Sequence, residues 1–232
     1  MKTALITGGN KGIGFAIANA LGQKDWQIVI GVRTEANGQS AMAKLQKVGV
    51  TKATFIMLDL SHPDTIEQAV EKIKFQFSDM QLLVNNAGIP GDMGASNLSV
   101  KEDNLRQTME VNFFGTFQLS QMLLPVLEAN DGRIINVTIP TDANPVWNPI
   151  SYKASKATQN VMMDSWAIDF SKNERSIEIF SVHPGPTTTD LNGNTALPGF
   201  HTADDVAEKI VDVISDGRSH NGDFIDIYPE LK

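Results

Sequence analysis

The 232-residue sequence contains no cysteine, and its basic residues are outnumbered by its acidic ones. Without cysteine the chain can form no disulfide and no thiolate metal site, and it has no cysteine nucleophile. With 19 Lys and Arg against 27 Asp and Glu, the formal net charge is −8. Nucleic-acid surfaces need clustered positive charge, so we expect no nucleic-acid partner. His201 and His220 show no metal-ligand spacing, and we expect no metal site.

An apolar run of about 18 residues or more is also missing, so we expect no membrane span. Met1-Lys2-Thr3 leads directly into a strand-like run rather than into a signal peptide, which favours a cytoplasmic protein. The sequence shows no repeat, no low-complexity segment and no linker. Its length therefore predicts one large domain with a full core.

What the sequence does contain is a glycine-rich stretch close to its start. Ala4–Ile6 is a short apolar run typical of a buried parallel strand, and Gly8, Gly12 and Gly14 follow it. Residues 15–21 then have the apolar spacing of a helix. A strand, a glycine loop and a helix in this order direct backbone N–H groups and a helix N-terminus at a phosphate. The stretch therefore predicts a nucleotide site.

The remainder of the chain alternates between strand-like and helix-like patterns. This alternation predicts the α/β class, with a doubly wound parallel sheet of about seven strands and helices on both faces. Ligands bind such sheets beyond the carboxyl ends of the strands. Further strands are expected at 27–32, 53–58, 81–84, 133–137, 177–182 and 223–228. Further helices are expected at 41–47, after a capping sequence at 61–64, at 105–128, at 152–171 and after a cap at Thr202.

Five motifs, in this order along the chain, together resemble those of the short-chain dehydrogenase/reductase family. They are Thr7-Gly8-x-x-x-Gly12-x-Gly14, Asn85-Asn-Ala-Gly88, Asn112, Tyr152-x-x-x-Lys156, and Pro184-Gly185 with Thr189. The resemblance covers nearly the whole chain, and Asn10-Lys-Gly-Ile-Gly14 with the Arg33 region looks like the carbonyl-reductase and ketoacyl-reductase branches. It implies a single NAD(P)-binding Rossmann domain over residues 1–232, with a short substrate lid near 187–200.

The resemblance also implies where a dinucleotide binds, and charge favours NADP(H) over NAD(H). Val32 stands where an NAD site usually has an acid for the ribose 2′-hydroxyl, whereas Arg33 and Lys11 are cations suited to a 2′-phosphate. Asp59-Leu60 is expected at the adenine edge. The expected cofactor-binding residues are Gly8, Asn10, Lys11, Gly12, Ile13, Gly14, Arg33, Asp59, Leu60, Asn85, Ala87, Gly88, Tyr152, Lys156, Pro184, Gly185, Thr187 and Thr189.

Tyr152 and Lys156 are four residues apart, so they project from one face of the expected helix. A lysine ammonium near a tyrosine favours tyrosinate and should lower the tyrosine pKa from its usual value of about 10. The pair could therefore donate a proton in carbonyl reduction and accept one in the reverse direction. By resemblance, Lys156 also holds the nicotinamide ribose, and Asn112 positions a water that relays protons to the lysine.

One position departs from the family pattern. Family members usually carry a substrate-binding serine where this chain has Ile139, and isoleucine cannot donate a hydrogen bond. Either Thr138 or Thr141 takes over that role, or the enzyme works with Tyr152 alone, or the protein binds NADP(H) with little reductase activity. An insertion or deletion before Tyr152 could also have shifted the register. Trp147 is expected beside the substrate.

These observations favour an NADP(H)-dependent carbonyl reductase or alcohol dehydrogenase that acts on a small molecule. A dinucleotide-binding regulatory or scaffold protein is the alternative, favoured by Ile139 and opposed by the intact Tyr152, Lys156 and Asn112. A sugar-nucleotide epimerase fits less well, because the chain has no room for a separate substrate domain. By resemblance, helices 105–128 and 152–171 are expected to associate as a homodimer or homotetramer.

Overall fold

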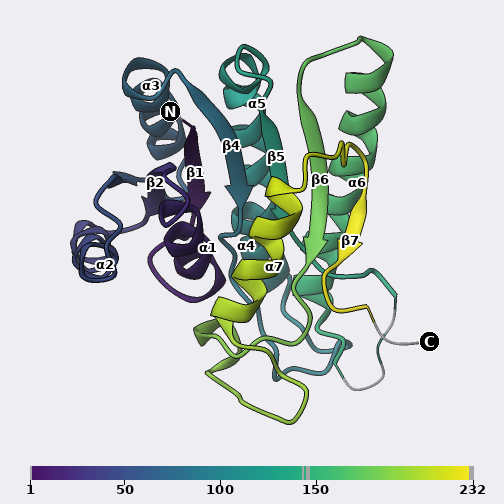
Figure 1. Ribbon diagram of the computed structural model, residues 1–232. Coiled ribbons are helices and arrows are strands. Elements are labelled where there is room, and N and C mark those ends of the chain that lie inside the picture. The colour runs from purple at the N-terminus through teal and green to yellow at the C-terminus, as the bar shows by residue number, and fades with distance from the viewer. Residues whose placement is uncertain (1, 143, 145–146, 230–232) are drawn as a thin grey trace.

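The computed structural model describes residues 2–142, 144 and 147–229, which form a layered structure around one sheet (Figure 1). The sheet has seven strands in the order β3-β2-β1-β4-β5-β6-β7, and all neighbouring pairs are parallel. This confirms the predicted doubly wound α/β sheet. The strands are β1 (Thr3–Thr7), β2 (Gln27–Val32), β3 (Ala53–Met57), β4 (Met80–Asn85), β5 (Arg133–Val137), β6 (Glu178–His183) and β7 (Phe224–Asp226).

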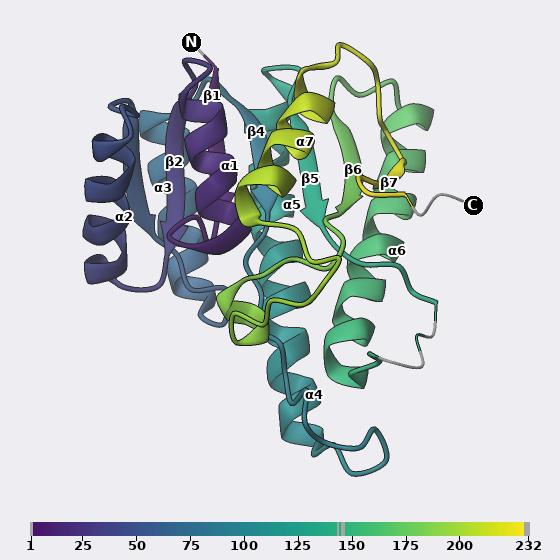
Figure 2. The ribbon, with the colours of Figure 1, turned by 60° about the horizontal axis from the view of Figure 1, so that its bottom comes forward.

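Helices cover both faces of the sheet, as Figure 2 shows from a second direction. On one face α1 (Gly12–Gly22), α2 (Glu35–Lys47) and α7 (Ala203–Ser215) enclose one apolar core. On the other face a second core lies beneath α3 (Pro63–Gln76), α5 (Gly115–Glu128) and α6 (Ile150–Lys172). Because both faces are covered, the central strands β1, β4 and β5 are buried along almost their whole length rather than alternating between buried and exposed residues.

Several helix starts differ from the sequence prediction. α2 begins at Glu35, earlier than the expected residue 41, because the Thr34 hydroxyl accepts a hydrogen bond from the Asn37 N–H at 3.3 Å. The predicted cap at 61–64 is wrong in detail, since His62 precedes α3 without any side-chain capping bond. The Thr202 cap is confirmed, and its hydroxyl accepts from the Asp205 N–H at 3.1 Å.

The single helix expected at 105–128 is wrong, because the chain forms three consecutive segments there. α4 (Glu102–Met109) is followed by the π-helical segment η1 (Glu110–Phe114) and then by α5. Asn112, in the middle of η1, is fully buried and bonds both main-chain groups of Ile89, at 2.8 and 2.9 Å. The helical periodicity of the sequence indicated neither the π-helical segment η1 nor its contact with the loop after β4.

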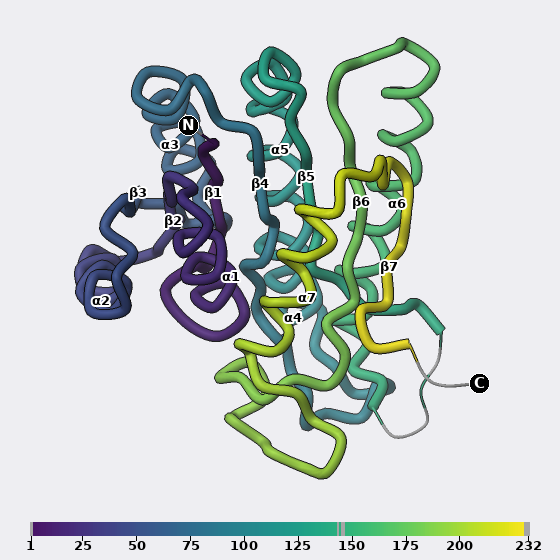
Figure 3. Tube along the Cα trace, in the orientation of Figure 1, coloured from purple at the N-terminus to yellow at the C-terminus, as the bar shows by residue number. Residues whose placement is uncertain are grey.

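The loops after β1, β4, β5 and β6 all lie at the edge of the sheet where these strands end. The Cα trace in Figure 3 shows the connection between β6 and α7 passing across this edge. The same connection contains the 3-10 turn η2 (Asp190–Asn192). Within the described residues, no helix is long and apolar enough to cross a membrane.

Candidate functional site

A cleft of about 1300 Å³ opens at the carboxyl ends of the strands, where the fold predicts a ligand. Its wall comes from the glycine loop, the loops after β2, β3, β4 and β5, helix α6 and the segment after β6. Most of the residues predicted for the site line it. They are Gly8, Asn10, Lys11, Gly12, Ile13, Arg33, Asp59, Leu60, Ala87, Gly88, Thr138, Ile139, Trp147, Tyr152, Lys156, Pro184, Gly185, Thr187 and Thr189.

The glycine loop leaves the N-terminus of α1 facing this cleft. Gly8 and Gly12 have φ values of +65° and +54°, which side chains other than glycine rarely adopt. Lys11 precedes the helix and its side chain makes no capping hydrogen bond, so it leaves the first-turn N–H groups uncapped. Gly14 does not line the cleft. A Cβ there would lie 2.4 Å from the Asn86 Nδ2, so this glycine permits close packing of the loop.

Asn85 also does not line the cleft, contrary to the prediction. Its buried amide donates to Ser120 and Asn136, both at 2.9 Å, on the other side of the strand. The next residue, Asn86, faces the cleft instead and donates to the Thr7 carbonyl at 2.9 Å. Neighbouring residues at a strand end point to opposite faces, and sequence alone did not show which asparagine faces the cleft.

At the part of the cleft beside the end of β2, the basic side chains are Lys11 and Arg33. Val32 is buried and neutral, and Arg33 is exposed on the cleft wall. Lys11 forms an ion pair with Asp190 of η2, with 2.9 Å between Nζ and Oδ2. The hydrogen bond from Lys11 holds the pKa of Asp190 below its usual range. One of the two predicted phosphate-binding cations is therefore shared with an acid.

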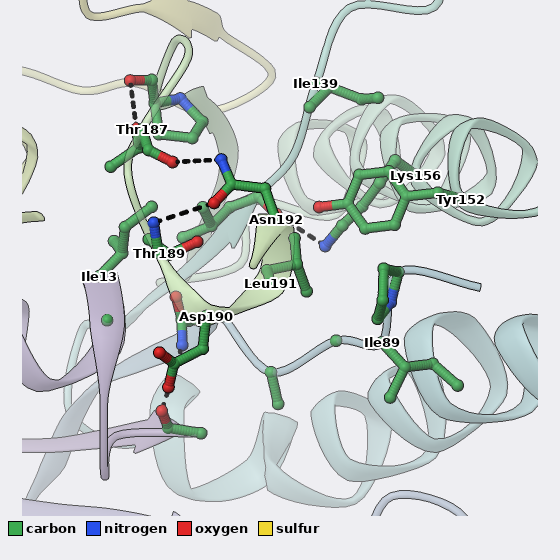
Figure 4. A pocket seen from close by; sticks show the side chains of 18 of the residues that line it. Ile13, Ile89, Ile139, Tyr152, Lys156, Thr187, Thr189, Asp190, Leu191 and Asn192 are labelled. Atoms are coloured by element: carbon green, nitrogen blue, oxygen red, sulfur yellow. Dashed lines mark hydrogen bonds between the residues drawn. The ribbon is translucent and has the colours of Figure 1, made fainter. Parts of the chain in front are cut away.

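Tyr152 and Lys156 project from α6 into the cleft, as Figure 4 shows. The Lys156 Nζ lies 5.8 Å from the centre of the Tyr152 ring. Burial raises the pKa of Tyr152 to about 12 and lowers the pKa of Lys156 to about 7. The sequence prediction of a lowered tyrosine pKa is thus wrong, because the phenol is buried and burial raises its pKa. Trp147 packs edge-on against the Tyr152 ring, with the ring centres 5.7 Å apart.

Asn112 lies behind this pair and does not line the cleft. Its amide bonds Ile89 and the Ser155 hydroxyl, and its main-chain carbonyl accepts from Gln159 Nε2. Gln159 was not among the residues predicted from the sequence. Its position gave a signal, because Gln159 lies one turn after Lys156 on the same buried side of α6, and a polar side chain there needs a hydrogen-bond partner.

The two threonines near Ile139 differ in position. Thr141 does not line the cleft, whereas Thr138 does. The Thr138 Oγ1 is buried and has no hydrogen-bond partner among the described residues. Ile139 faces the cleft as well, and its carbonyl accepts from the Asn160 amide at 3.0 Å. Of the two threonines, only Thr138 lines the cleft, and its hydroxyl is buried.

The segment expected to form a lid lies along the cleft. The Thr189 and Asn192 side chains cap η2 reciprocally, and Asn192 also donates to the Thr187 carbonyl at 2.9 Å (Figure 4). Leu197 and Phe200 add apolar surface to the cleft wall. Within the described residues no group of three or more His, Asp or Glu side chains is placed to hold a metal ion.

Comparison with known proteins identifies a family that matches this chain. The family model described as short chain dehydrogenase matches residues 2–197. Human 17-beta-hydroxysteroid dehydrogenase type 2 is 30% identical over 196 residues, covering 84% of this chain and 49% of that protein. Mouse carbonyl reductase [NADPH] 1 is 37% identical over 141 residues, covering 58% and 48%. The chain thus spans about half the length of these two curated relatives.

Among solved structures, a short chain dehydrogenase from Burkholderia cenocepacia in complex with NADP is similar in fold. It superposes with a TM-score of 0.80 at 30% sequence identity, covering 97% of this chain and 95% of that one.

Proposed function

The chain belongs to the short-chain dehydrogenase family, and from this premise we propose that it is an NADP(H)-dependent carbonyl reductase or alcohol dehydrogenase. The observation that carries the proposal is the placement of Tyr152 and Lys156 in the cleft that begins at the glycine loop. A proton-transfer group and a phosphate-binding loop in one cleft suit a reaction that pairs hydride transfer with protonation.

The residues present fit a dinucleotide. The uncapped first turn of α1 supplies N–H donors for a diphosphate, and Arg33 lies farther along the wall for the adenosine end. When bound, the cofactor supplies or accepts the hydride. Lys156, which lines the cleft with its amine buried, is placed to hold the nicotinamide ribose.

Tyr152 would act as the proton donor in the reductive direction. With a pKa of about 12 it is fully protonated near neutral pH, which is the form that gives a proton to a carbonyl oxygen. The Lys156 amine, with a pKa of about 7, is then partly charged and favours the tyrosinate that remains. We assign the second hydrogen bond to the substrate oxygen to Thr138, because its buried hydroxyl lacks a partner among the described residues.

NADP(H) is preferred over NAD(H) in this proposal. A neutral Val32 and an exposed Arg33 at the end of β2 suit a 2′-phosphate rather than a free 2′-hydroxyl. The mouse relative is named as an NADPH enzyme and the Burkholderia structure contains NADP, which supports the same choice. The pairing of Lys11 with Asp190 leaves Arg33 as the cation on which the preference mainly rests.

The alternative is a dinucleotide-binding protein with a regulatory or scaffold role. Ile139 favours it, because this side chain faces the cleft and cannot donate a hydrogen bond to a substrate. Tyr152 and Lys156, both in the cleft, favour the enzyme.

A reductase assay separates the two functions. Purified protein is mixed with NADPH or NADH and a panel of aldehydes, ketones and diketones, and loss of nicotinamide absorbance is followed. We expect turnover with NADPH, a lower kcat/KM with NADH, and loss of turnover in Tyr152→Phe without loss of NADPH binding. Tight NADPH binding with no turnover on any carbonyl would reject the reductase function and favour the dinucleotide-binding protein.

A further inference from the structure

Two polar side chains one turn apart on α6, Lys156 and Gln159, contact each other. Lys156 lines the cleft, and Gln159 lies beneath it. Gln159 is fully buried, and its Oε1 accepts from the Lys156 Nζ at 3.0 Å. Its Nε2 donates to the main-chain carbonyl of Asn112 at 2.5 Å. The side chain therefore joins α6 to η1 and ends directly on the amine that lines the cleft.

The orientation of the Gln159 amide follows from the chemistry of its partners. A main-chain carbonyl can only accept, so the NH₂ group of the amide must face Asn112. The amide oxygen then faces Lys156, whose amine donates. The reversed amide would place two acceptors together and two donors together, at the cost of both bonds. The two contacts thus belong to one arrangement of the side chain.

Lys156 has a second fixed acceptor in the Val137 carbonyl at the end of β5, at 2.8 Å. Two of the three hydrogens of an ammonium are then directed into the protein, and the third is left for the cleft. The Tyr152 ring lies beside the same amine. The direction of that third hydrogen is determined by where Val137 and Gln159 hold the nitrogen.

We propose that Gln159 is a positioning residue for Lys156, which holds the amine toward the cleft and stabilises its charged form. The inference rests on the proposed reductase function, in which Lys156 acts on the cofactor and on Tyr152. Both polar atoms of the amide are engaged, and an amide releases no proton at neutral pH. The contact therefore sets position and charge and is not a path for protons from η1.

The electrostatic surroundings of Lys156 are simple. Among the residues that the structure describes, burial is the cause of its lowered pKa, and Tyr152 on α6 is the titratable group beside it. From β6, His183 approaches the carbonyl of Thr138, the residue after Val137, at 3.4 Å. Burial lowers the pKa of His183 in spite of the opposing charge of Asp226, which favours the neutral ring. The Gln159 oxygen is therefore a main support of the lysine's charge.

Two substitutions of Gln159 test the inference in opposite directions. Gln159→Met keeps the length of the side chain and removes both hydrogen bonds, whereas Gln159→Glu places a carboxylate against Lys156. The pKa of Lys156 is measured by NMR titration of the ¹³C-labelled full-length protein, and kcat/KM with NADPH is measured against pH. We expect the lysine pKa to fall by about one pH unit in Gln159→Met and to rise by about one in Gln159→Glu.

The pH profile of kcat/KM should shift with the lysine pKa in both variants, and its maximum should fall about tenfold in Gln159→Met. Asn221→Leu is the matched control. Asn221 donates to the Ala167 carbonyl at 2.9 Å and so also bridges α6 to a neighbouring segment, but it does not touch Lys156. We expect this control to lose stability without any shift of the pH profile or of the lysine pKa.

The outcomes separate this inference from the proposed function. An unchanged lysine pKa in both Gln159 variants would overturn the positioning role, even if the wild type is an active reductase. A wild type that reduces no carbonyl would remove the proposed function, while the lysine titration still tests Gln159. If Gln159→Met does not fold, the upward shift in Gln159→Glu decides the question, and its absence overturns the inference.

Discussion

Thr138 and Ile139 are neighbours on the segment after β5 and differ in what they offer a substrate. Both line the cleft, but Thr138 carries a buried hydroxyl without a partner among the described residues, and Ile139 carries only hydrocarbon. An unsatisfied buried hydroxyl costs about 1–3 kcal/mol, which a ligand that accepts its hydrogen bond can recover. In the proposed reductase, Thr138 is therefore the candidate donor to the substrate oxygen, and Ile139 contributes only apolar surface.

Thr138→Val is expected to lower kcat/KM for a carbonyl substrate by about 10²-fold, since one donor to a developing oxyanion is lost. Thr158→Val is the control, because the Thr158 hydroxyl bonds the Ser155 carbonyl within α6 and does not line the cleft. Steady-state kinetics with NADPH measures both. An unchanged rate in Thr138→Val, together with a faster Ile139→Ser, would mean that the native site works without this donor.

Lys156 makes folding stability depend on pH. Its pKa is about 7 in the folded protein and about 10.4 when unfolded, so between these values the unfolded state binds more protons. The penalty for burying the ammonium is complete below pH 7 and is relieved as the pH rises. Tyr152 affects the pH dependence of stability only above about pH 10. There the tyrosine of the unfolded chain loses its proton, while the folded one keeps it up to its pKa of about 12.

Relative to Lys156→Met, the wild type should therefore gain about 2–3 kcal/mol of unfolding free energy between pH 7 and pH 9. Urea denaturation of both proteins at these two pH values measures the difference. Parallel pH dependence in the two proteins would show that the lysine titrates alike in the folded and unfolded states.

At the scale of elements, η2 and the glycine loop meet beside the cleft, which both of them line. The ion pair between Lys11 and Asp190 joins them, with side-chain exposures of 57% and 45%. A pair this exposed contributes little to stability, but it places a negative charge beside the expected phosphate site. η2 is itself held by the reciprocal cap of Thr189 and Asn192, so Asp190 is presented by an ordered turn.

Asp190→Asn is expected to tighten NADPH binding several-fold, because Lys11 is released and one negative charge is removed near the bound anion. Fluorescence titration with NADPH at low and high salt measures the effect, which should shrink as salt rises. Asp212→Asn is the control, since Asp212 pairs with Lys24 at 3.9 Å and does not line the cleft. Weaker binding in Asp190→Asn would instead make the acid part of the binding site.

For the whole molecule, the outer side of α6 and the adjoining η1 carry exposed apolar residues. Phe114, Val161 and Ile168 are 53, 63 and 54% exposed. These residues belong to the segments through which association was expected from the sequence. Apolar residues on two adjacent segments support a self-association surface, because another chain could cover them together.

We expect the wild type to form a dimer or tetramer, and Val161→Lys combined with Ile168→Glu to shift it toward monomer. Gel filtration with light scattering measures the mass of both. Phe75→Glu is the control, because Phe75 is 88% exposed on α3, on a different part of the surface. A monomeric wild type, or a double variant that assembles normally, would reject this surface.

Much of this protein could be read from local sequence. Residues 3–14 indicate a strand, a glycine loop and a helix because periodicity and glycine placement act over a few residues. The four-residue spacing of Tyr152 and Lys156 puts them on one helix face whatever surrounds them. The order of such elements then leads to the doubly wound sheet, and the sheet determines the edge at which ligands bind.

Tertiary structure alone decided which polar groups meet and which are buried. Gln159 joins Lys156 to Asn112, a residue 47 positions before Gln159 in the sequence. Asn86 rather than Asn85 faces the cleft, and a π-helical turn interrupts the expected long helix. The pKa values of Tyr152 and Lys156 belong here too. Such features depend on contacts between distant segments and on loss of hydration, which arise only once the elements have packed.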